Sequence, residues 1–378
     1  MPEAPPLVVA GPSGLYCAAG GFHIDPWRPV DRAVVTHAHS DHATAGCRRY
    51  LTSAVGRPVL ARRVQPDARI EGLPWGRTTS INGVTVSIFP AGHLLGSGQV
   101  RVEHAGRVEV ISGDYKVAPD PTCAGFEPVP CHRFVTESTF GLPIYRWPDS
   151  DAVAADMSAW WAANRSLDRT SVVFAYALGK AQRVLSMLLE AEAADPAATI
   201  FVHGSVHNFV EVYAAAGVRL PPVRKATPEL AKEHRGRALL VAPPSVLGTA
   251  WLKRWAPFST SFASGWMMVR GNRRRRGVDR GFVVSDHVDW PGLMRAIDAT
   301  GASSIGVTHG SSEAVVRYLR EARGMQADTV PTRWVSEEDG GDPGGGPGVA
   351  SNDIPMKTDP AEAEARREQE DPQPGLFG

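Results

Sequence analysis

The stretch Thr36-His37-Ala38-His39-Ser40-Asp41-His42 holds four potential metal ligands within six residues. Residues 32–36, Arg-Ala-Val-Val-Thr, precede it and are typical of a buried strand. Residues two apart point the same way from an extended chain, so His37 and His39 can bind one metal ion together. A turn after Ser40 would bring Asp41 and His42 to a second ion nearby. Imidazole and carboxylate ligands suit zinc, and they also bind manganese or iron.

The composition is that of a globular protein. The chain has 378 residues, of which 43% are hydrophobic and 21% charged, enough for one large domain or two ordinary ones. No apolar run approaches membrane-spanning length, and the first residues lack a signal-peptide pattern. We therefore expect a cytoplasmic protein without a membrane partner. Four cysteines without a Cys-x-x-Cys pair favour reduced thiols over disulfides.

A net charge of zero conceals an uneven distribution. Residues 336–378 carry eleven acidic and three basic residues, whereas residues 1–335 carry 29 acidic and 37 basic residues. A basic body is compatible with a polyanionic substrate. The segment after Val335 is rich in Gly, Pro and acids and poor in apolar residues, so we expect residues 336–378 to form a disordered acidic tail.

Six strand-like runs are each followed by a histidine or an acid. They are residues 32–36 before His37, 84–89 before His93, 107–112 before Asp114, 132–136 before Glu137, 281–285 before Asp286 and His287, and 304–308 before His309. In an α/β sheet, residues just past the strand ends gather along one edge, where sites form. We therefore expect these side chains to converge.

Residues 149–264 have a different pattern, in which strands and Ala- and Leu-rich helices alternate. This alternation predicts a small parallel α/β unit. Because candidate site residues lie on both sides of it, the unit is expected to be an insert. Residues 1–148 and 265–335 then form the two parts of the main domain.

The metal motifs resemble a known fold. His37-x-His39-x-Asp41-His42, followed by His93 and Asp114, is similar to the metallo-β-lactamase fold, an αβ/βα sandwich with a two-metal site. Three further motifs resemble those of the β-CASP nucleases: Glu137-Ser138-Thr139, Ser285-Asp286-His287 and Thr308-His309-Gly310. Ala-Leu-Gly-Lys-Ala-Gln at residues 177–182 resembles the β-CASP cap. More narrowly, residues 7–321 resemble bacterial exonucleases encoded beside an ATP-dependent DNA ligase, which are related to eukaryotic crosslink-repair nucleases.

The resemblance implies a role for each motif residue. His37, His39 and His93 would bind one zinc ion, Asp41, His42 and His309 the other, and Asp114 would bridge the two; manganese is the alternative metal. Two ions about 3.5–4 Å apart activate a shared water and neutralise charge on the phosphate. His287 would act as general acid, oriented by Glu137, so that Asp41, Glu137 and His287 are the expected catalytic residues.

Asp25 matches the first motif of the fold. It is expected to orient the His-x-His loop from behind the ligands. The alternative is a plain strand-end acid in a turn before Pro26.

Contacts to nucleic acid are expected from Ser138, Thr139, Lys180, Arg273 and Arg274. Lys180 begins a helix, where free backbone N–H groups and a cation coincide. The run of residues 273–276 is either a guide for the substrate strand or a solvated charged loop.

The C-terminal Gln373-Pro374-Gly375-Leu376-Phe377 resembles the pentapeptide by which bacterial repair proteins dock on the sliding clamp. Gln373, Leu376 and Phe377 would make the contacts.

The leading hypothesis is a two-zinc exonuclease that hydrolyses single-stranded or end-containing DNA during repair, associated with an ATP-dependent DNA ligase. An RNA-processing nuclease of the same fold is the alternative, because RNA-acting relatives carry a histidine where His309 stands. A small-molecule hydrolase of the lactamase or glyoxalase kind would need neither the insert nor the pair Glu137 and His287. A non-catalytic adaptor would not need the complete ligand set.

Overall fold

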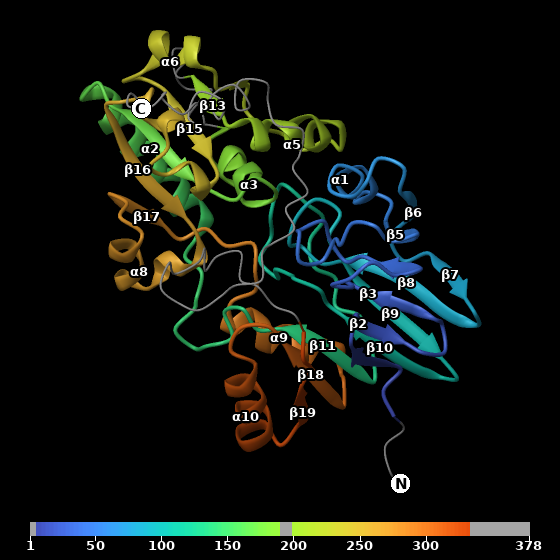
Figure 1. The fold of residues 1–378 in the computed structure, drawn as a ribbon. Coiled ribbons are helices and arrows are strands. Elements are labelled where there is room, and N and C mark those ends of the chain that lie inside the picture. Colours follow the sequence, from blue (N-terminus) through green and yellow to red (C-terminus); the bar gives the residue numbers. More distant parts are fainter. Residues whose placement is uncertain (1–4, 190–198, 333–378) are drawn as a thin grey trace, which may run out of the picture. The chain divides into compact units, whose positions relative to one another are not determined.

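A computed structural model describes residues 5–189 and 199–332, apart from the side chain of Arg273. This part of the chain forms three β-sheets with helices between and around them, a mixed α/β fold (Figure 1). The described helices are α1 (Arg57–Leu60), α2 (Ser150–Ser166), α3 (Lys180–Met187), α5 (Gly204–Ala215), α6 (Pro228–His234), α7 (Ala250–Lys253), α8 (Arg270–Arg275), α9 (Trp290–Thr300) and α10 (Ser312–Arg323), with short 3-10 helices η1 (Pro244–Val246) and η2 (Gly265–Met268).

The first two sheets come from both ends of the described chain. The first has the order β1 (Val8–Gly11), β2 (Gly14–Cys17), β3 (Phe22–Ile24), β4 (Arg32–Val34), β5 (Arg49–Ser53), β6 (Arg69–Leu73). The second has the order β19 (Gln326–Thr329), β18 (Ser304–Thr308), β11 (Arg133–Glu137), β10 (Arg107–Ile111), β9 (Gly98–His104), β8 (Val84–Pro90), β7 (Thr78–Ile81). The late strands β18 and β19 thus join a sheet begun by β7 to β11.

These two sheets bury their facing sides against each other. Alternate residues of a strand point to one face, and one buried cluster combines Phe22 and Ile24 of the first sheet with Val86 and Val100 of the second. Helices cover the outer faces. Residues of α9 and α10 pack on β11 and β18, and residues of α1 and α5 pack on β4 and β5.

The third sheet has the order β14 (Val223–Lys225), β13 (Ile200–Val202), β15 (Leu239–Ala242), β12 (Thr170–Phe174), β16 (Phe258–Ala263), β17 (Arg280–Phe282), and its described strands pair in parallel. α2, α3 and α5 contribute to the buried cluster on one face, where Trp160 and Trp161 pack. Its last strand, β17, lies beyond residue 264, the limit expected for the insert. The sheet therefore continues to Phe282.

Two features of the strands were not expected. The sequence favours two opening strands, residues 7–10 and 21–25, with a Gly-rich turn between them. The structure adds β2 in place of that turn, and β2 forms a tight antiparallel hairpin with β1. The six runs that precede the candidate site residues do not share one sheet edge. They belong to all three sheets: β4 to the first, β8, β10, β11 and β18 to the second, and β17 to the third.

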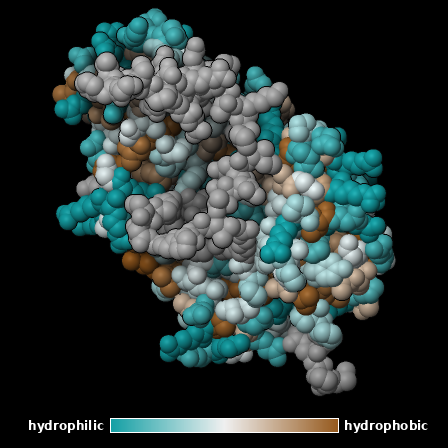
Figure 2. Space-filling model, viewed as in Figure 1, coloured by the Kyte–Doolittle hydropathy of each residue, from teal (hydrophilic) through white to brown (hydrophobic). Residues whose placement is uncertain are grey.

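The visible face of the protein is mainly hydrophilic, with apolar residues interspersed (Figure 2). Large apolar side chains that remain exposed, such as Val9, Ile144 and Leu247, lie at separate points of the chain. Among the described helices, none has the length and apolar character needed to cross a membrane.

Candidate metal centre

Three histidines and an aspartate lie together past the ends of β4, β8 and β10. The ligand atoms of His37, His39, His93 and Asp114 lie within 4.8 Å of one another. All four residues are buried. The ring centroids of His37 and His93 are 4.6 Å apart, and those of His39 and His93 are 4.8 Å apart. Buried rings at these distances can direct their nitrogens to one ion.

A second group shares Asp114 with the first and adds His42 and His309. Asp114 Oδ2 lies 3.5 Å from His37 Nε2 and 3.6 Å from His42 Nε2, while Asp114 Oδ1 lies 3.5 Å from His309 Nδ1. Asp114 therefore stands between the two groups. Asp41 is not a member of either group, although its Oδ2 lies 3.5 Å from His42 Nε2.

The protonation of these residues fits metal binding. Burial, reinforced by neighbouring imidazoles, holds the pKa of His37 well below its usual value, so this histidine is neutral. Burial opposes the charge of Asp114, but His42 and His287 hold its pKa well below the usual range. Neutral imidazole and ionised carboxylate are the forms that bind a metal ion.

His37 and His42 supply a further test of fit. His37 Nε2 is buried and makes no hydrogen bond within the described residues. Burial disfavours the charged form of His42, yet Asp41, Asp114 and Asp25 raise its pKa well above the usual value. A metal cation bound here would give His37 Nε2 a partner. It would also supply the positive charge that the carboxylates around His42 favour, so the donor set fits zinc or a similar ion.

Asp25 lies directly behind the His-x-His stretch. Its Oδ1 accepts from Thr36 N at 2.8 Å, and its Oδ2 accepts from Thr36 Oγ1 at 2.5 Å. Its Oδ2 is also 2.7 Å from His42 Nδ1. A carboxylate that receives the Nδ1 proton leaves Nε2 of the same ring available as a ligand.

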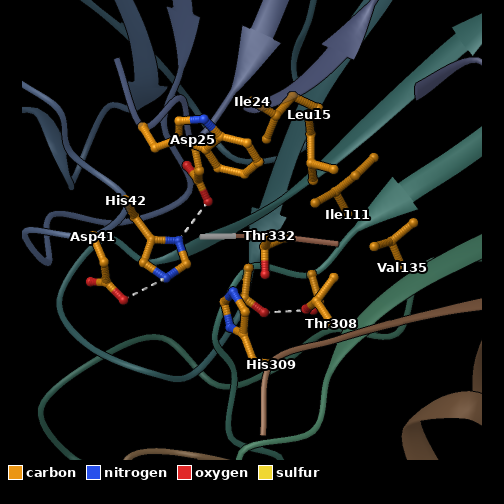
Figure 3. A pocket seen from close by; sticks show the side chains of 13 residues that line it. Leu15, Ile24, Asp25, Asp41, His42, Ile111, Val135, Thr308, His309 and Thr332 are labelled. Atoms are coloured by element: carbon orange, nitrogen blue, oxygen red, sulfur yellow. Dashed lines mark hydrogen bonds and ion pairs between the residues drawn. The ribbon is translucent and has the colours of Figure 1, made fainter. Parts of the chain in front are cut away.

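A small cavity adjoins the second group (Figure 3). It is lined by Asp25, Asp41, His42 and His309 on its polar side and by Leu15, Ile24, Ile111 and Val135 on its apolar side. Its volume is about 40 Å³, which exceeds the space that one water molecule needs. An ion or a water can therefore lie beside His42 and His309.

The pair Glu137 and His287 is brought together at the same centre. His287 Nδ1 lies 2.9 Å from Glu137 Oε2 and 4.0 Å from Asp114 Oδ2. Glu137 Oε1 also accepts from Tyr115 N at 2.8 Å, which holds the carboxylate in place. Burial opposes charge on His287, but Glu137 and Asp114 raise its pKa to about 10. The imidazole is therefore positively charged and carries a proton that it can donate.

Ser138 and Thr139 follow Glu137 at the end of β11. Ser138 Oγ donates to the carbonyls of Thr308 and His309, so it ties β11 to the end of β18. Thr139 is 5% exposed, and its buried Oγ1 has no hydrogen-bond partner within the described residues.

The basic residues expected to contact nucleic acid do not all lie where the sequence suggested. Lys180 is 2% exposed, and its Nζ lies 3.2 Å from Asp286 Oδ1, so its charge is directed into the protein. Arg274 is exposed on α8, which makes the arginine run a helix and not a loop. The Arg273 side chain and the residues Gln373, Leu376 and Phe377 lie outside the described structure. The roles of these residues toward nucleic acid and the clamp stay predictions.

Other charged residues at the centre had no role assigned to them from the sequence. Asp286, 2% exposed, lies between Lys180 and His93, whose Nδ1 is 2.8 Å from the Asp286 carbonyl. Arg183 pairs with Asp120, which in turn pairs with Lys116. Asp286 was expected to converge with the other site residues as part of the Ser-Asp-His motif, but its pairing with Lys180 was not. Asp120 lies in an ordinary-looking loop, and no local signal marks it.

Several curated proteins are similar to this chain, among them the following three. A "Probable DNA ligase" of Opitutus terrae is 31% identical over 329 residues, which are 86% of this chain and 31% of that protein. The cleavage and polyadenylation specificity factor subunit 3 of Dictyostelium discoideum is 27% identical over 152 residues, 39% of this chain and 18% of that protein. An endoribonuclease ysh1 of Aspergillus fumigatus is 31% identical over 224 residues, 47% of this chain and 25% of that protein.

The chain spans less than a third of the length of each of these relatives. No family model matches it.

Proposed function

The chain belongs to the metallo-β-lactamase β-CASP family, and on this basis we propose that it is a metal-dependent phosphodiesterase that cleaves DNA. The observation that carries the proposal is Asp114, which is shared by two groups of candidate ligands, all buried except the half-buried His309, and lies 4.0 Å from the charged His287. In this proposal the two facing sheets and their outer helices are the αβ/βα sandwich, and the third sheet belongs to the β-CASP cap. Residues 1–148 and the segment after Phe282 would form the sandwich, with the insert between them, because β17 belongs to the third sheet.

The proposed ligands follow the two groups. His37, His39 and His93 would hold one zinc or manganese ion, and His42, His309 and Asp41 the other, with Asp114 between them. When bound, two such ions supply a nucleophilic hydroxide at neutral pH and neutralise charge on the phosphate. Asp25 keeps the proton of His42 on Nδ1 and so reserves Nε2 for the ion.

His287 is proposed as the proton donor. Glu137 binds its Nδ1 at 2.9 Å and keeps the ring charged and oriented. The proton on Nε2 is then available to the oxygen that leaves the phosphorus atom. Thr139, whose buried hydroxyl has no hydrogen-bond partner among the described residues, is proposed to contact the phosphate.

The DNA substrate is supported by the relative from Opitutus terrae that is named a probable DNA ligase. A nuclease joined to a ligase would trim strand ends before they are sealed, which favours exonuclease action in repair. The alternative substrate is RNA. It is supported by His309 and by the relatives named as endoribonucleases.

The test is the digestion of end-labelled single-stranded DNA and RNA of one sequence, with zinc or manganese added. We expect shortening of the DNA, and loss of activity by a factor of about 100 or more in Asp41→Ala and His287→Ala. Asp67→Ala, an exposed acid outside the site, is the matched control and should stay active. Cleavage of RNA with intact DNA would assign the protein to RNA processing, and intact DNA and RNA would exclude both substrates.

Docking on a sliding clamp is proposed for Gln373, Leu376 and Phe377. Their motif is short, so the experiment must be specific. The full chain is expected to bind the purified clamp in solution, and Leu376→Ala with Phe377→Ala should abolish binding without changing digestion of free DNA. Equal binding by both proteins would refute the assignment. The same assay with an ATP-dependent DNA ligase tests that association.

A further inference from the structure

Arg183 lies inside the protein, 4% exposed, near the start of α3. Its Nε pairs with Asp120, its Nη1 donates to the Ser285 carbonyl at 2.5 Å, and its Nη2 donates to the His93 carbonyl at 3.2 Å. One guanidinium group therefore joins α3 to three segments that are far apart in the sequence.

Asp120 is itself held in place. Its side chain is 3% exposed, lies 3.3 Å from Lys116 Nζ, and accepts from Thr122 N at 2.9 Å. Burying charges is costly, and well-packed apolar side chains of similar size are often equally stable in such places. Stability alone therefore gives no reason for a buried arginine here, and the atoms it binds are informative.

Both carbonyls belong to segments of the metal centre. His93 is one of the proposed ligands. Ser285 lies two residues before His287, and its Oγ accepts from His287 N at 3.1 Å. Lys180, one turn earlier on α3, pairs with Asp286, the residue between Ser285 and His287 in the sequence. Helix α3 thus contacts the segment with His287 through two cations and the segment with His93 through one.

We propose that Arg183, oriented by Asp120, is a positioning residue that sets the placement of His93 relative to His287 and so connects the inserted unit to the metal centre. For its catalytic consequence this inference rests on the proposed function; for its effect on metal binding it does not. An arginine is suited to the role because its planar group presents several donors in a fixed geometry. A lysine cannot reach both carbonyls and the carboxylate in that way.

Three variants of the full chain separate positioning from stability. Arg183→Met keeps the length of the side chain and removes its donors, but leaves Asp120 with less compensation. Arg183→Met combined with Asp120→Asn removes one charge of each sign and should restore much of the stability. Arg183→Lys keeps the charge without the fork. Arg317→Met, which breaks an exposed pair with Glu321, is the matched control.

Each protein is measured for the denaturant midpoint, for Co²⁺ affinity from the absorption of the bound ion, and for kcat and KM on the cleaved nucleic acid. In the double variant we expect a midpoint near that of the unmodified protein. Its kcat and Co²⁺ affinity should remain about 10–100-fold lower, as is typical for residues behind metal ligands, with little change in KM. The kcat and Co²⁺ affinity of Arg183→Lys should lie between those of the double variant and those of the unmodified protein.

Unchanged kcat and Co²⁺ affinity in a folded double variant would overturn the inference. So would a recovery of both quantities in step with the midpoint, because that would make the role purely structural. If the double variant fails to fold, the same measurements on Arg183→Lys test the inference: lowered kcat and Co²⁺ affinity support it, and unchanged values overturn it. If the unmodified protein cleaves no nucleic acid, the proposed function fails, and the Co²⁺ titrations alone test the positioning.

Discussion

Asp25 shows how one side chain can select the protonation state of a candidate ligand. It lies just past the end of β3 with φ 44°, a left-handed conformation that Asp and Asn tolerate better than most residues. From there its carboxylate reaches Thr36 and His42. The sequence left two interpretations of Asp25 open, an orienting carboxylate or a strand-end acid in a turn before Pro26. The structure combines them, because the turn directs the carboxylate toward His42.

Asp25→Asn should weaken metal binding although it keeps the shape and the backbone conformation. An amide that donates to His42 Nδ1 forces the ring proton onto Nε2, the nitrogen that faces Asp114. We expect metal affinity to fall about 10–100-fold in a zinc competition titration. Asp31→Asn, at an exposed carboxylate, is the control and should bind normally. Equal affinities in the two variants would count against the role of Asp25.

The cysteines permit a prediction about pH. They are free, as the sequence indicated, and burial raises the pKa of Cys17 and Cys47 and brings that of Cys123 and Cys131 to about 12. The folded state therefore keeps thiol protons that the unfolded state loses near pH 9. Their contribution to stability is complete below that pH and is lost as the pH rises from about 9 toward 12.

We expect the denaturant midpoint to decrease from pH 8 to pH 10, and a variant with all four cysteines replaced by alanine to decrease less. In addition, thiol reagents at pH 8 should react much more slowly with the native protein than with the unfolded one, because the thiolate is the reactive form. Rapid reaction of all four native thiols would contradict the burial described here.

At the scale of elements, the end of β18 depends on two consecutive left-handed residues. His309 has φ 56° and Gly310 has φ 58°. This turn brings His309 Nδ1 to Asp114 and places Gly310 against the end of β11. A Cβ atom on Gly310 would lie 2.4 Å from the Ser138 carbonyl oxygen and 2.6 Å from Thr139 Cα. Both obstacles are backbone atoms, so they cannot move away cheaply.

Gly310→Ala is therefore expected to be destabilising by about 3 kcal/mol or more, since strain and a backbone clash combine. Gly301→Ala is a close control because Gly301 has φ 61° with open space around it. It should lose only the strain, about 1–2 kcal/mol. Denaturant unfolding measures both. A Gly310 variant no less stable than the Gly301 variant would show that the two strand ends can separate.

At the scale of the whole molecule, the candidate metal ligands and the proposed proton donor follow strands of three different sheets. His37 and His39 follow β4, His93, Asp114 and His309 follow strands of the second sheet, and His287 follows β17. An ion that binds the candidate ligands only in the folded state must stabilise the arrangement of the first two sheets.

Removal of metal should therefore lower the thermal midpoint. At a free ion concentration 100 times the dissociation constant, the stabilisation is about 2.7 kcal/mol. Adding Zn²⁺ to chelator-treated protein should raise the midpoint, whereas Ca²⁺, which prefers oxygen ligands, should have little effect. The variant with His37→Ala and His39→Ala should lose the response. An unmodified protein that also shows no response to Zn²⁺ would argue against a metal centre.

Local sequence patterns predicted the elements well because they depend on neighbouring residues. The strand-like runs at residues 84–89 and 107–112 correspond to β8 and β10, and the helices expected within residues 149–264 include α2. The histidines and acids that follow the runs converge. The types of the candidate ligands could be read directly, since metal chemistry depends on which side chains are present. The resemblance then ordered these residues into two groups, with Asp114 between them in the structure as well.

Tertiary structure alone decided how these residues are surrounded. Lys180 occupies a helix start that suits phosphate, yet packing of α3 buries it against Asp286, 106 residues later. Arg183 and Asp120 are 63 residues apart, and Arg183 and Ser285 are 102 apart. Burial and ion pairing between such distant positions leave no periodic or local signal, because they arise only when separate sheets and helices pack together.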